Sequence, residues 1–240
     1  MRRFLLTIAV LSLTTTLAGA DVIAEWDIAN ASGRSASVAY TADGVDATDL
    51  YAHGLNTWRP QWGTDGIVAA KNWGRHDRAI PGKYLQFSVA GEDVDYQSMS
   101  FSLTRGNGGG RGRGHGAETF AVRSSVDGFS SDLFVADLSD TPWDRQTVFE
   151  DVDISAIGTQ SGEVTFRMYG YNDTNPHDYA GLTNMAPGTA GVSGDGVNLS
   201  INGTTGGNLG GQPVPEPATM AMLAMGGAGL LLRHRRRRRC

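Results

Sequence analysis

Three tryptophans with polar neighbours are the residues best suited to binding chemistry in this sequence. They are Trp58, Trp62 and Trp73, and the polar residues beside them are Arg59, Gln61, Asn72, Arg75 and His76. An indole ring offers a flat apolar surface on which the CH groups of a sugar stack, while nearby polar groups bond to its hydroxyls. The cluster therefore predicts a carbohydrate-binding surface. The alternative is that these rings pack in the core, the commoner place for tryptophan.

A glycine-rich segment, Gly106–Gly116, is a second candidate site. It carries Arg111, Arg113 and His115 among backbone amides that suit phosphate or sulfate. A phosphate-binding loop normally opens a helix, and no helical pattern follows this one. The alternative is a long hairpin connection without a ligand.

Acid-rich segments are candidates for a structural calcium site. Asp43–Asp46, Asp93–Asp95 and Asp151–Asp153 each place two carboxylates close together, although none has the EF-hand spacing. Solvated turns are the alternative, and the sequence names no set of metal ligands. Apart from this calcium ion, no cofactor is expected.

Motifs that carry catalysis are absent from the sequence. The five histidines lack metal-binding spacing, there is no Gly-x-Ser-x-Gly, and the single cysteine, Cys240, is the last residue. No catalytic residue is therefore predicted, and the chain is expected not to be an enzyme. Paired carboxylates need only meet in space, so a secreted glycoside hydrolase or lyase stays an alternative.

Short alternating runs separated by Gly, Asp, Asn and Ser must position these residues. Alternation of period two indicates half-buried strands, and no stretch between Asp21 and Pro213 keeps a helical period. The predicted strands are Val22–Ile28, Ser35–Tyr40, Ile67–Trp73, Tyr84–Val89, Ser98–Thr104, Thr119–Val126, Leu133–Leu138, Thr147–Ile154, Val164–Tyr171 and Val197–Ile201. Many short strands with glycine-rich turns predict an all-β fold, an antiparallel β-sandwich of jelly-roll-like form.

The N-terminus has the pattern of a secretory signal peptide. A basic start at Arg2 and Arg3 precedes an apolar run and the small-residue site Ala18–Ala20. The two N-terminal arginines and six arginines near the C-terminus account for eight of the 20 basic residues. Twelve then remain against 25 acidic residues, so the mature region has a net charge near −13. Such a domain repels nucleic acid, which is not an expected partner.

The C-terminus combines a short motif, an apolar segment and a basic end. Pro215, Glu216 and Pro217 are followed by the uncharged segment Ala218–Leu232. The basic end comprises Arg233, Arg235, Arg236, Arg237, Arg238 and Arg239. The segment predicts one short transmembrane helix, with the arginines stopping transfer and staying on the cytoplasmic side.

This tail resembles the PEP-CTERM sorting signal, in its motif, its span and its basic end. The resemblance implies a Gram-negative host, export, and cleavage near the motif by an exosortase, a membrane cysteine protease. It also implies an exopolysaccharide or biofilm setting.

Two further segments resemble a pair found in exported PEP-CTERM proteins. Thr119–Phe129 contains VRSSVDGF and Phe166–Tyr171 reads FRMYGY, close to the "VRSSVDGF … FRFYGY" pair of β-sandwich domains without an assigned function. This resemblance supports the fold class and implies no catalytic residue.

The expected organisation has four parts: a signal peptide (1–20), a β-sandwich domain (21–187), a Gly/Thr/Asn-rich end of the domain with a linker (188–213), and the sorting signal (214–239). The expected function is that of a non-enzymatic cell-surface or extracellular-matrix protein, with a carbohydrate-binding module for exopolysaccharide as the alternative. The precursor is expected in the inner membrane. The processed protein is expected in the periplasm or outer membrane, on the cell surface or outside the cell.

Overall fold

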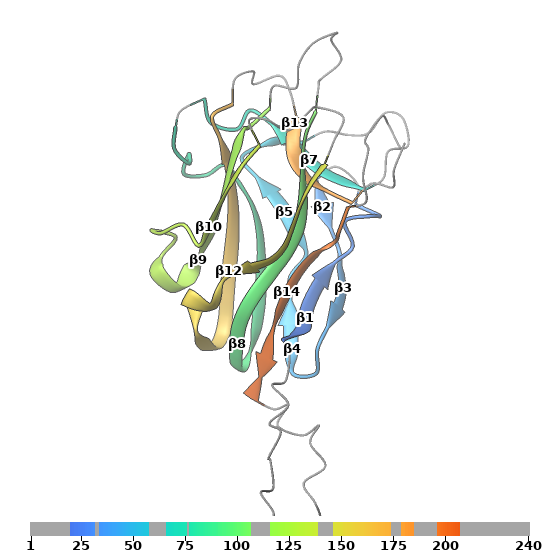
Figure 1. Ribbon diagram of the computed structural model, residues 1–240, viewed down its shortest axis with the longest axis vertical. Coiled ribbons are helices and arrows are strands. Elements are labelled where there is room, and N and C mark those ends of the chain that lie inside the picture. Colours follow the sequence, from blue (N-terminus) through green and yellow to red (C-terminus); the bar gives the residue numbers. More distant parts are fainter. Residues whose placement is uncertain are drawn as a thin grey trace, which may run out of the picture.

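The computed structural model describes residues 20–31, 34–57, 66–75, 77–106, 116–138, 146–173, 179–184 and 196–206. Within these residues the chain is nearly all β, and fourteen strands form one connected antiparallel sheet (Figure 1). The strands are β1 (Asp21–Trp26), β2 (Ser35–Ala36), β3 (Val38–Thr41), β4 (Val45–Ala47), β5 (Leu50–His53), β6 (Asn56–Thr57), β7 (Ile67–Lys71), β8 (Tyr84–Gly106), β9 (Thr119–Ser124), β10 (Phe134–Asp137), β11 (Gln146–Asp153), β12 (Thr159–Tyr171), β13 (Tyr179–Thr183) and β14 (Leu199–Thr205). Two single-turn 3-10 helices, η1 (Ser125–Asp127) and η2 (Ser155–Ile157), connect strands.

The 23-residue strand β8 belongs to two layers because it turns back on itself. Its first part, up to Gly91, pairs with β12 on one edge and with β4 and β5 on the other. Its second part, from Val94, pairs with β14, β11 and β13. Figure 1 shows β8 run to the lower end of the molecule and return. Asp93 has a φ of 50° at this corner, a left-handed conformation that a short polar side chain tolerates.

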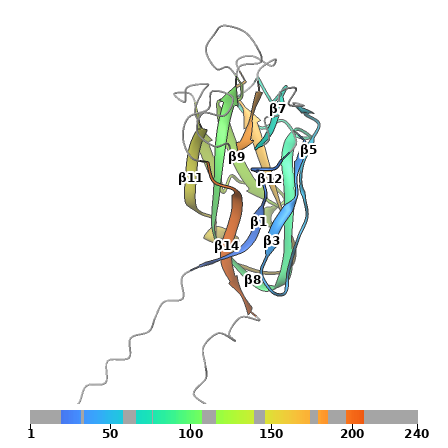
Figure 2. The same ribbon diagram turned by 90° about the vertical axis from the view of Figure 1, so that its right-hand side faces the viewer.

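The strands on the two parts of β8 pack face to face. The first layer contains β10, β9, β12, the first part of β8, β5 and β2, with β4 beside β8. The second contains β11, the second part of β8, β14, β1 and β3, and Figure 2 shows the last three side by side. Trp26 on β1 lies with its ring centroid 4.6 Å from that of Phe87 in the first part of β8. The fold is therefore sandwich-like.

One hydrophobic core joins the layers, and large aromatic rings dominate it. Phe87 stacks on Phe166 of β12 at 5.3 Å, and Tyr96, from the other layer, meets Phe166 edge-on at 5.8 Å. Each of these rings is at most 1% exposed. Burying such a side chain stabilises the fold by about 1.5–3 kcal/mol. Burial also raises the pKa of Tyr96 to about 12, and its hydroxyl donates to the Val89 carbonyl.

The predicted all-β antiparallel class is confirmed. The two strands predicted at Tyr84–Val89 and Ser98–Thr104 are parts of the single strand β8. Four strands were not predicted, β4, β5, β6 and β13, since each has at most five residues and local pattern identifies so short a strand poorly.

The C-terminal glycine-rich range contains a core strand. β14 lies within 188–213, pairs with β1 and β8, and buries Leu199 and Ile201 completely. This part of the range therefore belongs to the β domain, and residues 207–213 lie outside the described ranges. None of the helices in the described ranges is long and apolar enough to cross a membrane. The predicted transmembrane segment and residues 1–19 of the predicted signal peptide lie outside these ranges.

Candidate functional site

Trp73 is a core residue. Its side chain is 1% exposed, and its indole N–H donates to the carbonyls of Ala70, at 2.8 Å, and Ala180, at 3.1 Å. Phe120 packs against the ring at 5.4 Å. A Cβ at Gly170 would come within 2.7 Å of it. Burial therefore removes Trp73 from the predicted sugar-binding surface, as the core alternative holds for this residue; Trp58 and Trp62 lie outside the described residues.

The other predicted sites are placed only in part. Residues 107–115 of the glycine-rich segment lie outside the described residues. The acidic segments use their carboxylates locally: Asp93 accepts a hydrogen bond from Ser161 at 3.0 Å, and Asp151 accepts one from Ser98 at 3.4 Å. Within the described ranges, no three His, Cys, Asp or Glu side chains are grouped so as to hold a metal ion.

The outer face of the first layer carries an array of aromatic and basic side chains. Alternation turns Leu85 and Phe87 inward and leaves Tyr84 and Gln86 on the outer face. The register places Gln86 between Tyr51 of β5 and Arg167 of β12, and places His53 opposite Tyr84. We define the aromatic–arginine face by its six main side chains. They are Arg34, Tyr51, His53, Tyr84, Phe129 and Arg167.

Arg167 lies at the centre of this face between two rings. Its guanidinium carbon is 3.8 Å from the centroid of Phe129 and 4.3 Å from that of Tyr84. Its Nε donates to Gln86 Oε1 at 2.9 Å. Among the described residues, no carboxylate forms an ion pair with Arg167. Two rings therefore lie close to the guanidinium and its Nε is bonded, while its terminal nitrogens have no acidic partner among the described residues.

The remaining rings extend this site across β5. Tyr51, 40% exposed, lies 5.3 Å from His53, and His53 lies 5.1 Å from Tyr84 between ring centroids. Arg34 donates to the Tyr51 hydroxyl at 3.1 Å and lies over the Tyr51 ring. Burial, and then the charge of Arg167, lower the pKa of His53, so the neutral imidazole is favoured.

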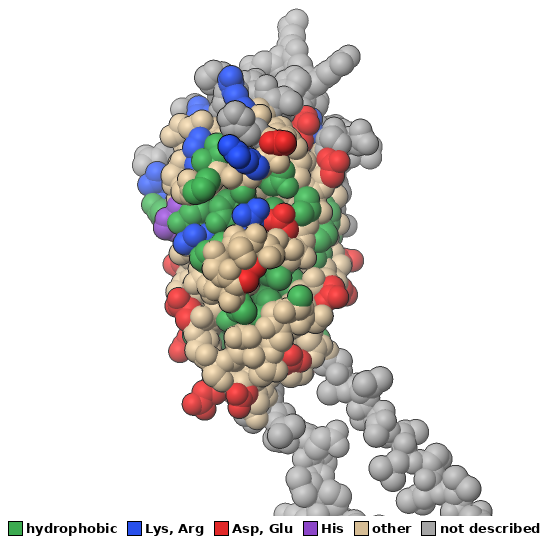
Figure 3. Space-filling view, turned by 90° about the vertical axis from the view of Figure 1, so that its left-hand side faces the viewer, with side chains coloured by type: hydrophobic (Ala, Val, Ile, Leu, Met, Phe, Trp, Pro, Cys, Tyr) green, Lys and Arg blue, Asp and Glu red, His purple; other side chains and the backbone are tan. Residues whose placement is uncertain are grey.

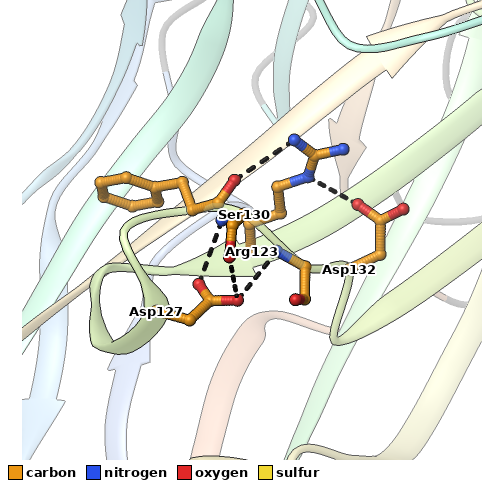
Figure 4. A network of polar contacts seen from close by, with 6 residues as sticks. Arg123, Asp127, Ser130 and Asp132 are labelled. Atoms are coloured by element: carbon orange, nitrogen blue, oxygen red, sulfur yellow. Dashed lines mark hydrogen bonds and ion pairs between the residues drawn. The ribbon is translucent and has the colours of Figure 1, made fainter.

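A tight turn after β9 holds Phe129 in place (Figure 4). Asp127 accepts hydrogen bonds from the Ser130 hydroxyl at 3.0 Å and from the Ser131 amide at 2.8 Å. Phe129 has a φ of 64°, and its carbonyl accepts a hydrogen bond from Arg123. The Arg123 Nε also donates to Asp132 at 2.6 Å. This network fixes the backbone that positions the Phe129 ring over Arg167.

The two sequence segments VRSSVDGF and FRMYGY are thus one structural unit. They lie on the paired strands β9 and β12, with Arg123 opposite Arg167. The Ser125 hydroxyl in the turn accepts a hydrogen bond from the Thr165 amide at 2.9 Å, which ties the turn to β12. The first segment supplies Phe129, whose ring packs on the Arg167 guanidinium, and the second segment supplies Arg167.

Charge is unevenly distributed over the surface. Seen from the side of β9 and β10 (Figure 3), basic and histidine side chains gather on the upper part, whereas acidic side chains are spread over the face down to its lower end. The aromatic–arginine face is therefore a local basic region on an acidic domain.

Sequence reasoning missed this face, although one signal for it was present. In β12 the inward residues Val164, Phe166 and Met168 alternate with Arg167 and Tyr169. That alternation predicts an outward arginine beside a tyrosine. The contribution of Tyr51 and His53 needed the pairing of β5 with β8, which no local pattern specifies.

The fold and the C-terminal sequence together define an exported β-domain protein with a sorting tail. A family model described as "PEP-CTERM protein-sorting motif" matches residues 213–237. The chain thus carries a PEP-CTERM sorting motif, as the residues at its C-terminus predicted, and this motif indicates an exported protein that an exosortase sorts. No curated protein and no solved structure matches the chain.

Proposed function

We propose that the protein is an exported cell-surface or extracellular-matrix protein with a structural or binding role and no catalytic one. The observation that carries this proposal is the sorting motif at residues 213–237, which follows a β domain. The acidic charge of the mature region supports it, because a net charge far from zero keeps an exported domain soluble.

In the finer form of this proposal, residues 1–20 are a signal peptide and the domain is a jelly-roll-like sandwich. Ala218–Leu232 anchors the precursor in the inner membrane, with Arg233 and Arg235–Arg239 on the cytoplasmic side. The exosortase cuts near Pro215–Pro217. The processed domain then reaches the periplasm or outer membrane, the cell surface or the medium.

Mass spectrometry of the exported protein tests this proposal. No peptide containing Arg233–Arg239 should be found in the exported form, whereas the membrane-bound precursor should contain it. Replacing Pro215, Glu216 and Pro217 by alanine should leave the precursor uncut in the membrane. Recovery of the complete C-terminus from exported protein would contradict the proposal.

A carbohydrate-binding role is the second candidate, and the aromatic–arginine face favours it. Partly exposed rings beside hydrogen-bonding groups are what a sugar requires. Tyr51, His53 and Tyr84 provide the rings, and Arg34 and Arg167 provide donors. The expected ligand is an exopolysaccharide, and the polymer-binding test described below applies to this role. Trp58 and Trp62 stay proposed contributors, and their replacement by alanine tests them separately.

A further inference from the structure

We propose that the aromatic–arginine face binds a polysaccharide that carries carboxylate groups, with a carboxylate on the terminal nitrogens of Arg167 and sugar rings on the neighbouring aromatic side chains. This inference rests on the exported binding role proposed above and names the class of ligand.

The geometry of Arg167 points to a planar anion. The rings of Tyr84 and Phe129 both lie within 4.3 Å of the guanidinium carbon, and Gln86 accepts the hydrogen bond of its Nε. The terminal nitrogens form a fork that matches a carboxylate with two parallel hydrogen bonds. Because the side chain is already held in one orientation, less conformational entropy is lost on binding.

Charge complementarity supports an acidic ligand. Arg167 brings positive charge to the face, and it forms none of the ion pairs that the structure gives for the described residues. Arg123, which lies opposite Arg167 on β9, forms an ion pair with Asp132, so the charges of these two side chains offset each other. An anion bound at Arg167 is therefore attracted by a cation that has no carboxylate partner among the described residues.

The shape of the face favours a polysaccharide over a peptide. Extended peptides usually add to a free sheet edge, where backbone groups are unpaired. Here the strands β5, β8 and β12 are paired on both sides of the arginine, and the site lies on the flat of the sheet. The row Tyr51, His53 and Tyr84 offers ring faces and edges, which suit the CH groups of successive sugars.

Binding of polygalacturonate, measured by calorimetry, tests the proposal. The full chain is purified in detergent with its six tail arginines changed to glutamine, so that the tail itself does not attract the polymer. The same polymer with its carboxyl groups methyl-esterified is the matched neutral probe, and dextran sulfate is the probe for other anions. We expect binding to polygalacturonate and at least about tenfold weaker binding to the ester, since a charge-assisted pair is lost.

Substitutions locate the site. Arg167→Lys keeps the charge but loses the fork, and it should weaken polygalacturonate binding about tenfold. Tyr51→Ala should weaken it several-fold because a stacking surface is lost. Tyr40→Ala is the matched control, since Tyr40 is 49% exposed on β3 of the other layer, and it should change nothing. Circular dichroism checks that each variant folds.

Several outcomes would overturn the inference. Equal binding of the ester and the acid, equal binding by the Arg167→Lys variant, or preference for dextran sulfate would each refute a carboxylate at Arg167. Concentration-dependent self-association that Arg167→Lys abolishes, without any polymer binding, would assign the face to a second copy of the chain. None of these results affects the test of C-terminal processing, so the two proposals fail separately.

Discussion

The outer faces of the two layers both point to solvent but use different side chains. On the second layer, β8 presents Ser98 and Ser100, and β14 presents Ser200 and Asn202 beside them. These small groups bond to their neighbours: Asn202 donates to Ser98 at 3.1 Å. On the first layer, the same kind of sheet surface carries the aromatic–arginine face.

The side chains of the two outer faces show which residues a solvent-facing sheet needs and which residues are additional to that need. On β8 and β14, serine and asparagine satisfy the solvent-facing part of the sheet without large apolar side chains, although Val22, Tyr40 and Val148 are exposed elsewhere on this layer. Large rings held partly in water, with arginines between them, are not needed for that purpose. The grouping of several rings with arginines, which the second layer does not show among its described residues, is the reason for proposing that binding occurs on the first layer.

The largest expected effect lies on the inner face of β12. Phe166→Ala removes a ring with no exposure that contacts Phe87 and Tyr96. It should lower the free energy of unfolding by about 3–5 kcal/mol, measured by urea denaturation. Arg167→Lys, one position along on the outer face, should cost less than about 1 kcal/mol. Equal losses would mean that the outer face also holds the fold together, and the contrast between the two layers would break.

Gly170→Ala should destabilise the protein by about 1–3 kcal/mol, because the added methyl group meets the Trp73 ring. Trp73→Phe makes room, so the double variant should lose less than the sum of the two single losses in urea denaturation. Additive losses would mean that Trp73 does not fill this space. The result separates a core tryptophan from the binding rings of the first layer.

Much of the fold could be predicted from local pattern, and the site could not. Alternation such as that of Met99, Phe101 and Leu103 identifies a strand because burial on one face follows period two. The corner in β8 escaped prediction, since Asp93 adopts a left-handed conformation that sequence alone does not specify. The sequence therefore predicted two strands, Tyr84–Val89 and Ser98–Thr104, where the structure has the single strand β8.

The site depends on contacts between distant parts of the chain. Tyr51 and Arg167 both face Gln86 because β5 and β12 pair with opposite edges of β8. The local sequence of β5 or β12 does not predict that these strands pair with β8. Trp73 shows the converse error: polar neighbours in sequence indicated a surface residue, but its ring enters the core between β9 and β12.

A smaller effect is expected from the ring that covers Arg167. Phe129→Ala removes one of the two cation–π contacts and should lower the free energy of unfolding by about 1 kcal/mol. Val126→Ala is a matched control in the same turn, because Val126 is 46% exposed, and it should have almost no effect. If both variants behave alike in urea denaturation, Phe129 contributes no more than a solvated side chain.

The smallest expected effect is the pH dependence of the Asp127 turn. Slight desolvation raises the pKa of Asp127, but hydrogen bonds from Ser131 and Ser130 outweigh it, so the net pKa is lowered. The ionised carboxylate therefore stabilises the folded state above the pKa of the unfolded chain, and that stabilisation is lost as pH falls through the folded-state value. At this exposed site it should be at most about 1 kcal/mol.

Asp127→Asn tests this sign by urea denaturation between pH 6 and pH 3. The variant should be less stable than the parent at pH 6, and the difference should shrink as pH falls below about 4, where the parent carboxylate becomes protonated. Asp46→Asn, at an exposed position on β4, controls for the loss of one negative charge from an acidic domain. A difference that stays constant with pH would show that the turn needs the second acceptor oxygen, which asparagine replaces with an NH2 group, and not a charge. In that case Phe129 would keep its place over Arg167 in acid, and the aromatic–arginine face would persist where the carboxylates of its proposed ligand are neutralised.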